Sequence, residues 1–113
     1  MFNTEKDTTV TNALMMEQLE GKAAEAAQLL KLLANETRLL ILCRLVAAGE
    51  MSAGTIVAAA GLGQSAVSQH LGKLRDDGLV TTRRDAQTIY YRIADNNVAR
   101  IISVLKDIYC GDA

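Results

Sequence analysis

The chain has 113 residues, of which half are apolar, and a net charge of −1. This length predicts one domain, and the apolar share is large enough for a core, although a chain of this size often gains stability by forming a dimer. No apolar run approaches the roughly 18 residues of a membrane span, and the N-terminus lacks the segments of a secretory signal, so we expect a cytoplasmic protein without a membrane partner. A single histidine and the lack of a glycine-rich phosphate loop argue against an enzyme.

The N-terminal third predicts a tail followed by one long helix. Residues 1–12 are polar and unpatterned, as expected of a flexible tail. A helix is expected from Asn12 or Ala13 to Leu33, because apolar residues recur there with the spacing of a heptad seam. The seam consists of Met16, Leu19, Ala23, Ala26, Leu30 and Leu33. Such a seam is equally consistent with packing inside the domain and with a dimer interface.

Two shorter helices are expected next. Asn35 is a good N-cap for a helix over 36–48, and Gly49 ends this helix. Its expected inward residues are Leu39, Leu40, Leu42, Cys43, Val46 and Ala47. Ser52 caps a further helix that extends to Ala60. The inward residues of that helix are expected to be Ile56, Val57 and Ala60.

The stretch from Gly61 to Gly78 predicts the recognition half of a helix-turn-helix. Val67, Leu71 and Leu74 recur at helical spacing and form an inward stripe. A different face is short and polar, and it carries Ser65, Ser68, Gln69 and Gly72, with Lys73 beside it. Small residues permit close approach to a DNA major groove, and Gln, Ser and Lys reach bases and phosphates. The alternative is an ordinary amphipathic surface helix.

After this helix the apolar period changes to that of a strand. Residues 79–84 and 88–93 are β-prone, and residues 85–87 form a turn between them. The predicted hairpin carries Arg83 and Arg84 near its tip, where they can reach phosphates or an adjacent minor groove. A hairpin with a solvated, charged tip is the alternative, but its position directly after a polar-faced helix favours a wing.

A last helix is expected over 96–110. Its apolar stripe consists of Val98, Ile101, Ile102, Leu105, Ile108 and Tyr109. This stripe can pack with the first helix, either within one subunit or between two. Basic residues exceed acidic ones over 64–92, whereas residues 1–36 are acidic overall, so the positive charge gathers where the DNA-binding elements are expected.

Together these segments resemble the ArsR/SmtB family of winged-helix bacterial transcription regulators. The family signature reads here as Ser68-Gln69-His70-Leu71, then Leu74, then Gly78-Leu79-Val80, and the resemblance covers residues 20–110. It implies a mostly helical winged helix-turn-helix with a small β-hairpin, in the order α-α-α-α-β-β-α, over residues 13–113. It also implies a homodimer that binds an inverted-repeat operator in double-stranded DNA and releases it on sensing an inducer.

The resemblance assigns residues to these roles. The implied DNA contacts are Gln64, Ser65, Ser68, Gln69, His70, Lys73, Arg83, Arg84 and Gln87. The dimer interface is expected from the first and last helices, through Met16, Leu19, Ala23, Ala26, Leu30, Ile102, Leu105 and Tyr109.

The inducer is the remaining question. Members that sense metals carry a Cys-x-Cys pair before the recognition helix, or Asp, His and Glu ligands on the last helix. Ser52-Ala53-Gly54-Thr55 stands at the first place and His70 is the sole histidine, so neither a metal nor another cofactor is predicted. Cys43 and the Tyr109-Cys110 pair instead resemble the BigR/SqrR-like dithiol branch, which senses sulfide-derived persulfides. Cys43 is also consistent with a core thiol, whereas Cys110 has no evident packing role.

The implied function is that of a transcription regulator, a repressor, with Cys43 and Cys110 as its redox-sensing residues. A persulfide or another oxidant would link the two thiols through a disulfide or a longer polysulfide bridge, and the protein would then release operator DNA. Three alternatives stay open at this point. They are a metal-responsive repressor, an activator that displaces another repressor, and a winged helix that binds only proteins.

Overall fold

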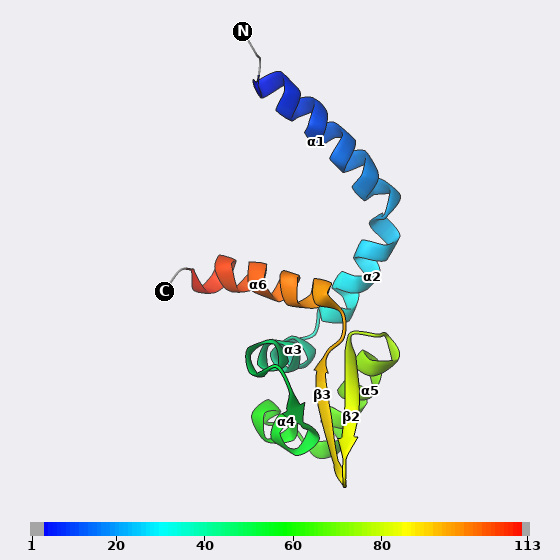
Figure 1. Ribbon diagram of the computed structural model, residues 1–113, viewed down its shortest axis with the longest axis vertical. Coiled ribbons are helices and arrows are strands. Elements are labelled where there is room, and N and C mark those ends of the chain that lie inside the picture. Colours follow the sequence, from blue (N-terminus) through cyan, green and yellow to red (C-terminus); the bar gives the residue numbers. More distant parts are fainter. Residues whose placement is uncertain (1–3, 112–113) are drawn as a thin grey trace. The chain divides into compact units, whose positions relative to one another are not determined.

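The computed structural model describes residues 4–111, with side chains from residue 12 onward. The chain divides into two compact units, residues 1–33 and residues 34–113. Six helices and three strands follow in the described residues (Figure 1). Their order is α1 (Thr4–Gly21), α2 (Ala23–Leu33), α3 (Glu36–Ala48), β1 (Met51–Ser52), α4 (Ala53–Ala60), α5 (Gln64–Asp76), β2 (Val80–Asp85), β3 (Thr88–Ile93) and α6 (Asn96–Cys110). The predicted class, mostly helical with a small β-hairpin, is confirmed, and the hairpin belongs to a three-stranded antiparallel sheet.

The first unit differs from the single helix predicted for it. Helix α1 begins at Thr4, within the predicted tail of residues 1–12, whose first three residues lie outside the described part. It ends at Gly21, and α2 starts at Ala23 after a tight turn, in which the amide N of Lys22 donates to the carbonyl O of Leu19 at 2.9 Å. Glycine has a low helix propensity, which accounts for a break at this position. The predicted heptad seam is therefore divided between two helices.

The core of the second unit gathers around α3, which contacts α4, α5, α6 and β3. The residues of α3 that become buried are Ile41, Leu42 and Leu45. The prediction of its inward face was therefore wrong for four residues, since Leu40, Cys43, Val46 and Ala47 are exposed. Helix α3 is apolar around most of its circumference, so its periodicity did not define which side the other elements cover.

Helices α4 and α5 follow the prediction closely. Ser52 caps α4 by accepting a hydrogen bond from the amide N of Thr55 at 3.2 Å, and Ile56 is buried. On α5 the predicted stripe of Val67, Leu71 and Leu74 is buried with at most 2% of each residue exposed. The core also takes in Leu79 and Val80 at the start of the hairpin. These contacts fix which face of α5 points to solvent.

The sheet contains one strand more than predicted. Strands β2 and β3 form the expected antiparallel hairpin, with Arg83 opposite Tyr90, and they run side by side in Figure 1. Strand β1 pairs with the other edge of β3, with Ser52 also opposite Tyr90, so the strand order is β1-β3-β2. Two residues are too few to show an alternating pattern, so β1 was missed.

Helix α6 buries only the first part of its predicted stripe. Val98 and Ile102 are buried, whereas Ile108 is 65% exposed and Tyr109 81% exposed. Its second half therefore presents an apolar surface that the described residues of the second unit do not cover. None of the helices in the described part of the chain combines the length and the hydropathy that a bilayer crossing requires.

The N-terminus of α3 allows a direct test of local structure. The side-chain Oδ1 of Asn35 accepts a hydrogen bond from the amide N of Arg38 at 3.0 Å. Asn35→Ala is expected to lower the free energy of unfolding by about 1 kcal/mol, because that amide loses its partner. Asn35→Asp keeps the acceptor and is expected to retain stability. Urea denaturation measures both, and equal losses in the two variants would contradict the capping role.

Candidate DNA-binding surface and dithiol pocket

The solvent face of α5 is polar and accessible. Gln64, Ser65, Ser68 and Gln69 are exposed, opposite the buried stripe that fixes the rotation of the helix. Lys73 is also exposed, and its Nζ lies 3.1 Å from the Asp77 carboxylate, one turn further along. Five of the six residues predicted on this helix are thus accessible from solvent, and the side chains at Ser65 and Ser68 are short.

His70 is placed differently from its neighbours on this helix. It is half-buried, and its Nδ1 accepts a hydrogen bond of 3.4 Å from Nε of Arg38 in α3. Arg38 was not predicted, because the two residues lie 32 positions apart and nothing local connects them. The contact links α3 directly to α5.

The hairpin presents Arg84 and Gln87 to solvent, as predicted, but Arg83 is engaged within the protein. Its Nε lies 2.9 Å and 3.1 Å from the two carboxylate oxygens of Glu50, and its Nη2 lies 2.7 Å from one of them. The guanidinium also lies over the ring of Tyr90, with 4.4 Å between Cζ and the ring centroid.

This ion pair changes the titration of both partners. The hydrogen bonds from Arg83 hold the pKa of Glu50 below its usual range, and the positive charges of Arg83 and Arg92 act in the same direction. The same hydrogen bonds raise the pKa of Arg83. Glu50 is therefore ionised at neutral pH. Sequence reasoning missed Glu50, which lies 33 positions from Arg83 and is brought near it by β1.

Both cysteines line one apolar pocket between α3 and α6, with a volume of about 520 Å³. Both are free thiols with exposed positions. The pocket is lined by Leu39, Cys43, Val46, Ala47, Ile102, Ser103, Leu105, Lys106, Tyr109 and Cys110. Of the described residues that line this pocket, Lys106 alone is charged. The structure thus brings together two thiols that are far apart in the sequence.

The surroundings of Cys43 affect its reactivity. Partial burial, and secondarily the nearby Cys110 thiolate, raise the pKa of Cys43 above its usual value. Because the thiolate is the nucleophile, Cys43 is expected to be a slow nucleophile at neutral pH. Cys110→Ser removes the second cause, so the pH-rate profile for alkylation of Cys43 by iodoacetamide is expected to move to lower pH. Mass spectrometry follows the rate, and an unchanged profile would contradict the proximity of the two thiols.

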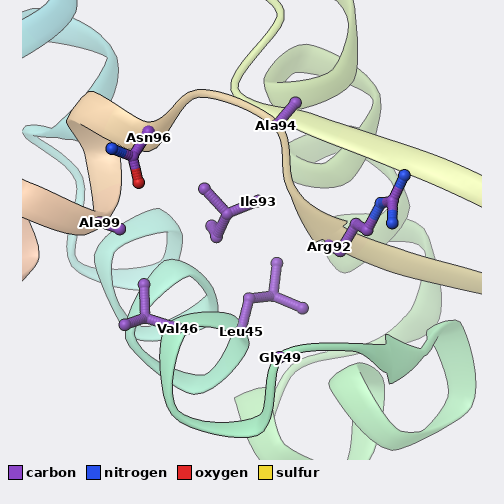
Figure 2. A pocket seen from close by; sticks show the side chains of 8 residues that line it. All are labelled: Leu45, Val46, Gly49, Arg92, Ile93, Ala94, Asn96 and Ala99. Atoms are coloured by element: carbon purple, nitrogen blue, oxygen red, sulfur yellow. The ribbon is translucent and has the colours of Figure 1, made fainter.

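A second cavity, of about 270 Å³, lies beside the C-terminal end of α3. Figure 2 shows Ile93 pointing into it, toward Leu45 and Val46 of α3, with Asn96 and Ala99 of α6 on the other side. Val46 lines both this cavity and the dithiol pocket. One part of the surface of helix α3 therefore carries Cys43 and lines the dithiol pocket, and another part packs against strand β3. Arg38, near the N-terminus of α3, contacts α5.

Comparison with known proteins decides the family. Residues 35–82 match the model described as bacterial regulatory protein, arsR family. The transcriptional activator HlyU of Vibrio cholerae is 45% identical over 95 residues, which is 84% of this chain and 87% of HlyU. The chain belongs to the arsR family of bacterial regulatory proteins. It is a transcriptional regulator, not an enzyme, and regulators of the arsR family bind operator DNA.

Solved structures agree with this assignment. The transcriptional repressor BigR from Xylella fastidiosa matches with a TM-score of 0.80 and 41% identity, over 84% of this chain and 96% of BigR. Reduced HlyU from Vibrio cholerae matches with a TM-score of 0.76 and 46% identity, over 83% of this chain and 98% of that structure. Helices α4 and α5 and the β2–β3 hairpin occupy the segments for which the sequence predicts the helix-turn-helix and the wing.

Proposed function

We propose that this arsR-family regulator senses persulfides and related oxidants through Cys43 and Cys110, and that linking the two thiols releases operator DNA. The observation that carries the proposal is the shared pocket, in which both thiols lie between α3 and α6. We propose that the reduced protein represses its target genes. The relatives include both a named activator and a named repressor, so an activator that displaces another repressor is the alternative.

The chemistry needs only the two thiols and a sulfane-sulfur donor. The thiolate of one cysteine attacks the outer sulfur of a persulfide R–S–SH, forming Cys–S–SH and releasing the thiolate R–S⁻. The second cysteine attacks the inner sulfur of Cys–S–SH, which forms the disulfide and releases HS⁻. Where both cysteines are first converted to Cys–S–SH, their reaction gives a trisulfide bridge and H₂S. With a peroxide, a sulfenic acid forms first, and its condensation with the second thiol releases water.

Cys110 is the thiol that we expect to attack first. It lies at the exposed end of α6, whereas partial burial raises the pKa of Cys43 and disfavours its thiolate. Cys43 then acts as the resolving thiol. Cys43→Ser is therefore expected to stop the reaction at a persulfide on Cys110, which adds about 32 Da for the one sulfur atom.

Release of DNA follows from the position of α3. A Cys43–Cys110 bridge fixes α3 against the end of α6, and α3 holds the recognition helix through the contact between Arg38 and His70. In a symmetric dimer the two recognition helices must lie about 34–36 Å apart to enter successive major grooves. A shift of α3 that changes this spacing weakens binding, and typical allosteric couplings of this kind amount to about 1–3 kcal/mol.

A homodimer is part of the proposal. On α1 and α2, Met16, Leu19 and Leu30 are each more than half exposed, and on α6 Tyr109 is exposed as well. Exposed apolar residues on a folded chain mark interaction sites, and each of the two units carries such residues. The proposed interface combines these residues with Ala23, Ala26, Ile102 and Leu105. A metal-responsive repressor is the other alternative; where the structure describes side chains, no three His, Cys, Asp or Glu residues form a group that could hold a metal ion.

The test is intact mass spectrometry of the reduced protein after glutathione persulfide, with hydrogen peroxide in parallel. We expect an intramolecular Cys43–Cys110 link, with about 32 Da added for each inserted sulfur atom after persulfide, and a plain disulfide after peroxide. Peptide mapping locates the link. Thiols modified separately, with no link between them, would overturn the dithiol mechanism.

A further inference from the structure

Arg83 is held by two residues, Glu50 and Tyr90, that are not among the DNA contacts predicted from the sequence. The strand order β1-β3-β2 places Tyr90 between Arg83 on β2 and Ser52 on β1. Glu50 directly precedes β1, so its carboxylate reaches across β3 to Arg83. The guanidinium is therefore held by a carboxylate at one edge and by an aromatic ring at one face.

The contacts occupy only part of the guanidinium. Glu50 binds the edge formed by Nε and Nη2, with distances of 2.7–3.1 Å. None of the hydrogen bonds found among residues 4–111 uses Nη1. The Arg83 side chain is 52% exposed, and the edge formed by Nη1 and the remaining Nη2 hydrogen is the part that Glu50 does not bind. A guanidinium has five N–H donors, and a free edge of this kind matches the two oxygens of a phosphate.

Folding stability does not explain this arrangement. Both charged groups are solvated, and water and salt screen an ion pair at such a position, so it adds little to the free energy of unfolding. An arginine side chain that is already oriented contributes more to the free energy of ligand binding than to the free energy of unfolding. The side chain of arginine loses much rotational freedom when it is fixed on a ligand, and this loss is smaller if the protein holds the side chain in place beforehand.

We propose that Glu50 and Tyr90 are positioning residues for DNA binding, which hold Arg83 so that the free edge of its guanidinium donates to a backbone phosphate beside the wing. This inference rests on the DNA-binding part of the proposed function and is independent of its thiol chemistry. Glu50 acts only through Arg83, so its removal changes DNA affinity only while Arg83 is present. The opposite possibility, in which Glu50 competes with the phosphate for Arg83, predicts tighter binding when Glu50 is removed.

The test is a double-mutant cycle on reduced protein, using a duplex selected by the wild-type protein from a random-sequence library. We expect Glu50→Ala to weaken binding about fivefold, a typical effect of one net hydrogen bond. A plot of log affinity against log salt concentration has a negative slope. Arg83→Ala is expected to make this slope less steep by about 0.9, which corresponds to the loss of one phosphate contact. The double variant is expected to bind no more weakly than Arg83→Ala alone.

Further variants separate the proposed positioning effect from an effect of net charge and from misfolding. Asp85→Asn removes one negative charge from the same hairpin and is expected to leave binding unchanged or slightly stronger. Tyr90→Phe keeps the ring under Arg83 and is expected to bind like the wild type, whereas Tyr90→Ala is expected to resemble Glu50→Ala. Circular dichroism checks the fold of each variant. Tighter binding by Glu50→Ala, or an equal loss in the Arg83→Ala background, would overturn the proposal.

Discussion

Cys43→Ser and Cys110→Ser are each expected to abolish the response of DNA binding to persulfide while leaving the reduced affinity unchanged. Neither thiol belongs to the buried core, so serine is expected to fit at both positions without loss of fold. After treatment with glutathione persulfide, wild-type affinity should fall about tenfold or more, within the usual range of allosteric coupling. The variants should change less than about twofold, since one remaining thiol cannot form an intramolecular bridge.

Fluorescence anisotropy with the selected duplex measures both effects. Ser103→Ala is a matched control, because Ser103 lines the same pocket and takes no part in the thiol reaction. It is expected to respond like the wild type. Loss of DNA binding by either cysteine variant after persulfide treatment would show that a modification of one thiol is enough, and would contradict the bridge.

Leu45→Ala is expected to have the largest effect on stability among the changes considered. Leu45 has no exposed surface, and it lies in α3 against the rest of the core. Removing its side chain leaves a cavity, and such changes typically lower the free energy of unfolding by about 2–5 kcal/mol. The matched change Leu40→Ala removes the same atoms from a residue that is 37% exposed, and we expect a loss of about 1 kcal/mol or less.

Urea denaturation at one fixed protein concentration compares the two variants, because the stability of an oligomer depends on concentration. Equal losses would mean that Leu40 is as well packed as Leu45 in solution. That result would contradict the division of α3 into a buried side and an exposed side. It would also support the prediction from the sequence, in which Leu40 belongs to the inward face of α3.

Local patterns predicted most of the second unit. The stripe of Val67, Leu71 and Leu74 is separated by polar residues, so its helical period defined both the helix and its buried face. The caps at Asn35 and Ser52 were predicted for the same reason, since a capping side chain bonds within its own turn. The alternating apolar pattern similarly located the hairpin.

The prediction failed in segments where neighbouring residues show no local contrast between apolar and polar positions. In α3 nearly every position from 39 to 47 is apolar, so only the packing of other elements decides which side is buried. The break at Gly21 divides a seam whose spacing continues through it, and β1 is too short to carry a pattern. The pairs Glu50–Arg83 and Arg38–His70 connect residues more than 30 positions apart, which no local rule can match.

The dithiol is a different case. Spacing gave no reason to pair Cys43 with Cys110, and the pairing came only from the resemblance to the dithiol branch of the family. The structure adds that both residues line one pocket, because α6 packs on α3 near Cys43 and carries Cys110 at its end. Whether this pair controls DNA binding is the central claim of the proposed function.

The most direct test measures operator affinity on one protein sample in two states, first reduced and then with the Cys43–Cys110 bridge confirmed by peptide mapping. The proposed mechanism predicts that the bridged protein binds the selected duplex about tenfold more weakly or worse, and that a reductant restores the affinity. Equal affinity of the reduced and bridged forms would contradict it, and would leave the two thiols without a role in DNA release.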